Sequence, residues 1–157
     1  MGEREMILLV AALVFFSSIS LSVNRFFIDS GEMMVRNEFD YEAISIAQRF
    51  IEEDKTRRFD LYEPPASFTS PWSLGQAYYE SYPNFNDVDD LHNLTLSITT
   101  PRAVYQVSME VYYVTSANIN QKVNYTTRFK KLVVNVSNPY QTRTIRLAHV
   151  YSYIDNT

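Results

Sequence analysis

The sequence contains no cysteine, only three glycines and only two histidines among its 157 residues. The absence of cysteine excludes a disulfide framework and a thiolate metal site. Three glycines are too few for a glycine-rich phosphate-binding loop, and two histidines are too few for a histidine-rich metal site. Basic residues are also outnumbered, with 14 Lys and Arg against 18 Asp and Glu. No basic stripe is present to neutralise phosphates, which argues against a nucleic-acid partner.

The most informative segment is a long apolar run near the N-terminus. Residues 6–23, MILLVAALVFFSSISLSV, are 18 consecutive positions without a charge, Pro or Gly. As a helix rising 1.5 Å per residue, the run would be ~27 Å long, close to the thickness of a hydrocarbon core. The flank before it lacks the net positive charge and the cleavage site of a secretory signal. We expect a membrane span or a helix-bundle segment that is retained in the product.

The helical pattern continues beyond the apolar run, because no Pro occurs between residues 24 and 58. Four apolar residues recur at spacings of four, three and four: Phe39, Ala43, Ile46 and Phe50. This periodicity is typical of an amphipathic helix with one core-facing stripe. The sequence therefore predicts a helix over 1–58, apolar throughout in 1–24 and amphipathic in 25–58.

The rest of the chain is predicted to form a connecting segment and a sheet. Residues 59–92 are rich in Pro and have no clean periodicity, whereas period-two alternation dominates 93–157. Four strands are expected, at 94–100, 104–115, 125–136 and 144–154. Short connections favour antiparallel pairing, and one face of the sheet needs the amphipathic helix as its cover. The predicted fold class is α+β, with a long N-terminal helix packed on a four-stranded antiparallel sheet.

The alternation also assigns side chains to faces. In the second predicted strand five residues share one face, namely Tyr105, Val107, Met109, Val111 and Tyr113. In the third strand Leu132, Val134 and Val136 are expected to point inward, with Lys131 and Asn135 outward.

This architecture, with the residues of its N-terminal helix, resembles the type IV pilin and pseudopilin family. In that family a leader peptidase cuts after a Gly, and the mature chain begins with an N-methylated residue, commonly Phe or Met. A glutamate at the fifth mature position and an apolar helix follow. Met1 and Glu5 match that register if residue 1 is the mature start. Glu3 and Arg4 replace the apolar residues usual there, as in an outlying branch of the family.

The resemblance implies a structural subunit of an extracellular helical filament, with roles in adhesion, motility or secretion and without enzymatic activity. Its partners would be further copies of the chain, the assembly machinery and, before assembly, the inner membrane. Glu5 would pair with the α-amine of Met1 in a neighbouring subunit, because an unpaired carboxylate is costly in an apolar bundle. The alternative is that Glu5 is a solvated charge at a membrane interface.

Two other functions are compatible with the sequence. One is a pseudopilin of a secretion system. The other is a single-span membrane protein whose small extracytoplasmic domain senses or binds a ligand.

An acidic loop and three sequons are the remaining candidate sites. Asp87, Asp89 and Asp90 could offer oxygen ligands to Ca²⁺, although the loop lacks the glycine and the twelfth-position glutamate of an EF-hand. A solvated acidic loop is the alternative. Asn93, Asn124 and Asn135 begin Asn-X-Ser/Thr sequons and are candidate glycan acceptors.

Catalysis has no support in the sequence. Neither His92 nor His149 accompanies a nucleophile motif, and His149 shares a strand face with Leu147 and Tyr151. We therefore expect no enzymatic activity.

Overall fold

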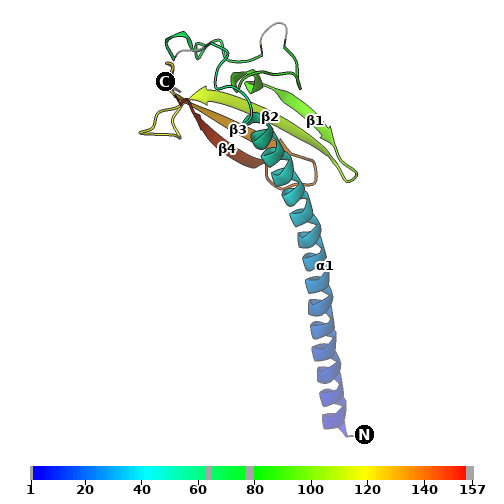
Figure 1. Cartoon of the computed structure of the whole chain (residues 1–157). Coiled ribbons are helices and arrows are strands. Elements are labelled where there is room, and N and C mark those ends of the chain that lie inside the picture. Colours follow the sequence, from blue (N-terminus) through cyan, green and yellow to red (C-terminus); the bar gives the residue numbers. More distant parts are fainter. Residues whose placement is uncertain (1, 63–64, 77–79, 155–157) are drawn as a thin grey trace. The chain divides into compact units, whose positions relative to one another are not determined.

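The computed structural model describes residues 2–62, 65–76 and 80–154. Its elements are the helix α1 (Glu3–Asp54), two 3-10 turns η1 (Pro65–Ser67) and η2 (Asp89–Leu91), and four strands, β1 (Thr95–Thr99), β2 (Val104–Tyr113), β3 (Phe129–Ser137) and β4 (Ile145–Ser152) (Figure 1). The chain divides into two compact units, residues 1–39 and 40–157. Met1, the predicted mature start, lies outside the described residues.

The first unit consists of the N-terminal part of α1, whose apolar side chains are exposed. None of its most apolar 18-residue window is buried. By length and composition, α1 is able to cross a membrane. Large exposed apolar surfaces mark sites of interaction with membranes or with other protein chains.

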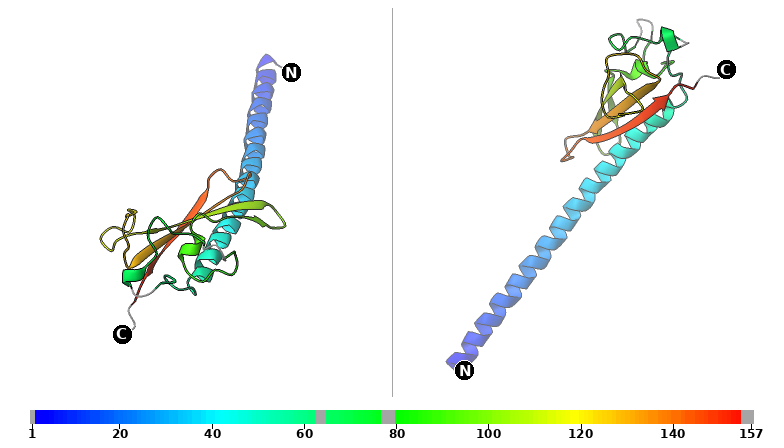
Figure 2. Two further views of the ribbon diagram at one scale, coloured as in Figure 1. Left: turned by 90° about the horizontal axis from the view of Figure 1, so that it is seen from above. Right: turned by 90° about the vertical axis from the view of Figure 1, so that its left-hand side faces the viewer.

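The second unit contains an antiparallel sheet in the order β1-β2-β3-β4. Its register places Val107 opposite Val136 and Val134 opposite Leu147, so the apolar residues of neighbouring strands fall on one face. Figure 2 shows the strands side by side with the last turns of α1 against this inner face. The predicted α+β fold, with one long helix on a four-stranded antiparallel sheet, is confirmed.

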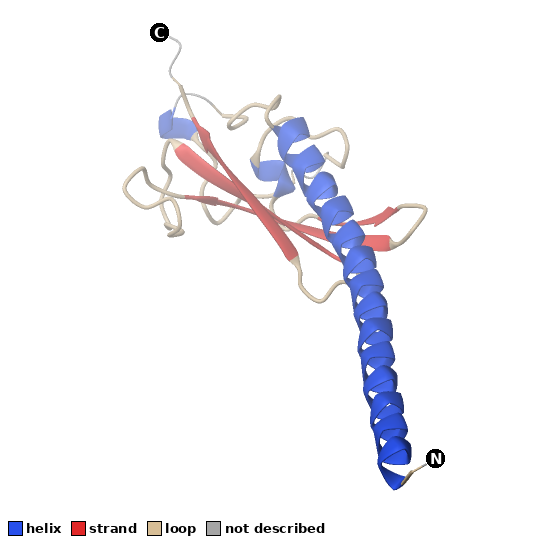
Figure 3. Ribbon diagram, turned by 90° about the horizontal axis from the view of Figure 1, so that it is seen from below, coloured by secondary structure: helices blue, strands red, loops and turns tan. Residues whose placement is uncertain are grey.

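The C-terminal turns of α1 cover the sheet (Figure 3). Ala43, Ile46 and Phe50 are buried there, whereas Phe39, which belongs to the first unit, is partly buried. Hydrogen bonds from strand tyrosines help to fasten the helix: the Tyr105 hydroxyl donates to Glu42 Oε2 at 2.7 Å, and the Tyr151 hydroxyl donates to the carbonyl of Ile51 at 3.4 Å.

Part of the outer face of the sheet is covered by the loop of residues 114–128. The strand β3 starts at Phe129, where this loop ends, and not at residue 125 as predicted. Lys131 lies on the outer face, yet it is buried because its Nζ donates to the Ile119 carbonyl at 3.1 Å and to Asn120 Oδ1 at 2.8 Å. A second apolar cluster, Tyr112, Val114 and Val133, fills the space beneath the loop.

Candidate functional site

Glu5 lies in the first turn of α1 and caps it. Its Oε2 accepts a hydrogen bond of 3.1 Å from the backbone N–H of Gly2. A glutamate at the third helical position that reaches back to the residue before the helix is one half of a capping box. The carboxylate is exposed and has a partner within its own chain.

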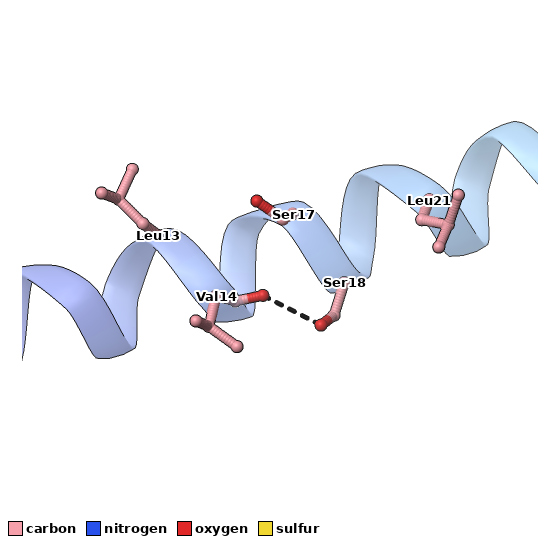
Figure 4. A pocket seen from close by; sticks show the side chains of 5 residues that line it. All are labelled: Leu13, Val14, Ser17, Ser18 and Leu21. Carbon is pink, nitrogen blue, oxygen red and sulfur yellow. Dashed lines mark hydrogen bonds between the residues drawn. The ribbon is translucent and has the colours of Figure 1, made fainter.

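A hollow open to the side follows Glu5 along the helix. It is lined by Leu13, Val14, Ser17, Ser18 and Leu21 (Figure 4). The hydroxyl of Ser18 donates to the backbone carbonyl of Val14 at 2.9 Å. The hydroxyl of Ser22 donates to the backbone carbonyl of Ser18, also at 2.9 Å. The polar groups of both serines are therefore satisfied within the helix, as an apolar environment requires.

The acidic loop is buried. Asp87, Asp89 and Asp90 are at most 4 % exposed, so the interpretation as a solvated loop is wrong. The loop is folded inward on itself, because Oδ1 of Asp87 accepts the backbone N–H of Asp89 at 3.1 Å and that of Asp90 at 3.3 Å. It is also fixed to the segment after α1 by the hydrogen bond from Val88 N to the carbonyl of Arg58 at 3.0 Å.

Lys130 supplies the positive charge that permits this burial. Its side chain is fully buried at the start of β3. The Nζ donates to Asp89 Oδ1 at 2.7 Å, to Asp60 Oδ2 at 2.8 Å and to the carbonyl of Phe59 at 2.7 Å. An ammonium group has three donors, and these three acceptors use them all. The rings of Phe59 and Tyr113 lie 4.8 Å and 5.4 Å from Nζ and complete its surroundings.

Lys130 and the carboxyl groups around it form one buried cluster, which consists of Asp60, Asp87, Asp89 and Lys130. Asp60 accepts the most hydrogen bonds of these carboxyl groups. Its Oδ1 accepts the backbone N–H of Tyr62 at 3.0 Å and the hydroxyl of Thr69 at 3.1 Å. Its Oδ2 accepts the backbone N–H of Thr69 at 2.9 Å in addition to the ammonium of Lys130. The hydroxyl of Tyr113 lies between the Thr69 carbonyl, at 2.8 Å, and Asp60 Oδ2, at 3.3 Å.

Asp87 holds a proton at neutral pH. Burial raises the pKa of its carboxyl group to about 8, and the negative charges of Asp89 and Asp90 add to the effect, while Lys130 opposes it. At pH 7 the cluster therefore combines an acid, in Asp87, with the carboxylate–ammonium pairs of Lys130.

Three carboxylates of the cluster lie close enough together to be considered as the predicted cation site. Carboxylate oxygens of Asp60, Asp87 and Asp89 lie within 4.8 Å of one another, a spacing that one cation could bridge. Lys130 Nζ contacts two of these three carboxylates, so it acts as their internal counter-ion. Asp90 instead accepts the backbone N–H of Asn86 at 3.1 Å. Ca²⁺ binding therefore stays a prediction, and Lys130 accounts for the arrangement of Asp60 and Asp89.

A further buried carboxylate ends α1. Burial raises the pKa of Asp54 to about 7, while Tyr151 and Arg57 lower it. The nearest cation is Arg57, whose Nε lies 3.9 Å from Asp54 Oδ1. A negative charge at the C-terminus of a helix is also opposed by the helix dipole.

The sequons and histidines fall in different environments. Asn93 and Asn124 are exposed, whereas Asn135 is partly buried within β3. His92 accepts the backbone N–H of Val111 through Nδ1 at 3.1 Å, and the ring of His149 packs edge-on against Tyr151 at 4.6 Å. These contacts give both histidines a role in packing.

Lys130, Asp60 and Tyr113 were not predicted to belong to one cluster. A signal for Lys130 was present, because it lies two residues before Leu132 and period-two alternation assigns it to the apolar face. A lysine on such a face needs a buried carboxylate as its partner. Asp60 carried no comparable signal, since it lies in the segment without periodicity.

The chain was compared with known proteins. No protein-family model, no curated protein and no solved structure matches it.

Proposed function

We propose that the chain is the structural subunit of an extracellular helical filament of the type IV pilin or pseudopilin kind. The observation that carries this proposal is the difference in burial between the two parts of α1. The helix residues from Asp40 onward pack on the chain's own sheet, whereas the side chains of the apolar run of residues 6–23 are exposed. Polymerisation would bury that run against other copies, with the sheet domains as the outer shell.

The surface of the run suits close helix packing. Ser17 and Ser18 are small side chains between Leu13 and Leu21, and they leave the hollow described above. Small residues allow the backbones of neighbouring helices to approach closely in apolar surroundings. The hydroxyl of Ser18 is already bonded to a carbonyl, so its burial leaves no donor unsatisfied.

Localisation follows from the same segment. Before assembly α1 would hold the subunit in the inner membrane, and the assembled filament would lie at the cell surface. The pilus or secretion machinery would be the partner that extracts the subunit from the membrane.

A single-span membrane protein with an extracytoplasmic domain is the second candidate. The capping bond between Glu5 and Gly2 favours it, because this carboxylate already has a partner without a second subunit. In a filament, Glu5 would exchange that contact for the α-amine of a neighbouring chain.

Electron microscopy of the full chain after detergent removal tests the proposal. Filaments are expected from the parent protein. The double variant Ser17→Leu/Ser18→Leu should still fractionate with membranes, because both changes increase the apolar character of the run. It should form few filaments, since it fills the hollow. Absence of filaments from the parent, with full membrane association, would instead support the single-span protein.

A further inference from the structure

We propose that Lys130 and Asp89 become joined by an isopeptide bond between Nζ of the lysine and the side-chain carbonyl carbon of the aspartate. The bond would tie β3 covalently to η2, across 41 residues of sequence. It is independent of the proposed function.

The geometry places the two reacting groups in contact. Nζ of Lys130 lies 2.7 Å from Oδ1 of Asp89, and the two side chains are 0 % and 5 % exposed. Both are held from the backbone as well. Lys130 lies in β3 between two neighbouring strands, paired with Tyr113 and Tyr151, and the backbone N–H of Asp89 donates to Asp87 at 3.1 Å. Reacting groups fixed at contact distance gain a large effective concentration.

Asp89 is the better electrophile of the two carboxylates at Nζ. Asp60 accepts three further hydrogen bonds from Tyr62 and Thr69, which hold its carboxyl group in a fixed orientation. Asp60 is therefore positioned to hold the amine and to exchange a proton with it.

The surroundings favour a neutral product. Two aromatic rings face Nζ, and the pair is withdrawn from water. Burying an ion pair carries a desolvation penalty that its mutual attraction only partly offsets. An amide in the same place carries no charge, and the expelled water molecule returns to bulk solvent.

The reaction balances with the groups present. Asp60 accepts one proton from the ammonium, and Asp87 gives its proton to Asp89. The neutral amine then attacks the carboxyl carbon of Asp89, and a new C–N bond forms. The attacking nitrogen returns a proton to Asp87, while the C–O bond to one hydroxyl breaks and that hydroxyl leaves as water with the proton from Asp60. One ammonium and one carboxylate are thereby converted into one amide and one water, and no oxidant or reductant is consumed.

Asp87 is the acid that this sequence needs. Its oxygen lies within 4.8 Å of those of Asp89 and Asp60. With a pKa raised to about 8, mainly by burial, it still carries its proton at neutral pH. Such an acid, poised near the working pH, is suited to proton transfer.

Intact mass spectrometry of the full chain, purified in detergent and then fully denatured, tests the proposal. An ion pair does not survive denaturation, whereas an amide does. The expected mass is lower than the sequence mass by one water molecule. Peptide mapping should recover one branched peptide that contains both Lys130 and Asp89. A full sequence mass would overturn the proposal, and a branch from Lys130 to Asp60 would overturn the choice of Asp89.

Three variants sharpen the result. Lys130→Arg retains the charge but should show its full sequence mass. Asp89→Asn should lose ammonia in place of water, because its leaving group is the side-chain amide nitrogen, and its final mass should equal that of the parent protein. Asp87→Asn retains Lys130 and Asp89 but lacks the acid, so it should retain its full mass while its near-ultraviolet circular dichroism matches that of the parent. Loss of water by folded Asp87→Asn would remove Asp87 from the reaction.

Discussion

The hydroxyl of Tyr105 donates a hydrogen bond of 2.7 Å to Oε2 of Glu42, across 63 residues of sequence. Tyr105 is in β2 and Glu42 is in α1, so this bond fixes the rotation of the helix on the inner face of the sheet. Because the acceptor is a carboxylate, the bond is of the stronger, charge-assisted kind.

Tyr105→Phe should therefore reduce the free energy of unfolding of the sheet domain by about 1.5 to 3 kcal/mol. Urea unfolding of the full chain in detergent, followed by near-ultraviolet circular dichroism, measures the change. Tyr125→Phe is the matched control, because Tyr125 is exposed and should lose less than about 0.5 kcal/mol. Equal effects of the two changes would show that the Tyr105–Glu42 bond does not fasten the helix.

Phe50→Ala should destabilise the same domain by about 3 to 5 kcal/mol, because it removes a buried ring and leaves a cavity between α1 and the sheet. A small domain has only about 5 to 15 kcal/mol in total, so its folding would become marginal. Tyr41→Ala removes an exposed aromatic ring from the same helix and is the control. A measured loss below about 1 kcal/mol for Phe50→Ala would contradict the docking of this face.

The raised pKa of Asp54 should make the stability of the sheet domain depend on pH. Its pKa is raised to about 7 in the folded state, against about 4 in the unfolded chain. Between these values the folded state binds the proton and the unfolded state does not, so stability is lost as pH rises from 4 to 7. The loss is at most about 1.4 kcal/mol per pH unit.

Asp54→Asn mimics the protonated acid and should remove this contribution. The variant should be more stable than the parent at pH 7, and the difference should shrink toward pH 5, as measured by urea unfolding at each pH. Asp87, whose pKa is also raised, remains in both proteins and cancels in the comparison. A difference that does not change with pH would show that Asp54 is ionised in the fold.

Glu5→Gln separates the capping role of Glu5 from its charge. Gln at this position still accepts the N–H of Gly2, as in other capping boxes, so α1 should begin as before. If the carboxylate pairs with an amine of a neighbouring subunit, its loss costs about 3 to 5 kcal/mol and filament yield should fall sharply. Glu3→Gln, compared at equal expression, is the control. If both variants form filaments in the parental yield, Glu5 serves only as a helix cap and does not pair with a neighbouring subunit.

Removal of residues 3–23 should give a soluble monomer with an intact sheet domain. The buried residues that the structure describes in that domain lie after residue 40, so its core does not depend on the apolar run. Size-exclusion chromatography and electron microscopy without detergent would measure the outcome. Filaments formed by the truncated chain would show that the run is not the polymer's core.

The fold was predictable because two different periodicities separate α1 from the strands. The inward set of Val107, Val111 and Leu132 follows directly from alternation, and all three are buried. The site was harder to predict from the sequence, because burial of the acidic loop depends on Lys130, which lies 41 residues from Asp89 in the chain. Strand boundaries also shifted where the loop of residues 114–128 folded over the outer face, which no local pattern of the sequence encodes.

The serine hydroxyls bonded to carbonyls one turn earlier have a consequence for transport of the subunit. Because Ser18 and Ser22 keep both polar groups occupied inside the helix, these groups need neither water nor a partner chain. Moving the segment from lipid into contact with another protein therefore requires no exchange of these hydrogen bonds. The direction of such a transfer is then governed by shape complementarity and by the freedom of the displaced lipid chains.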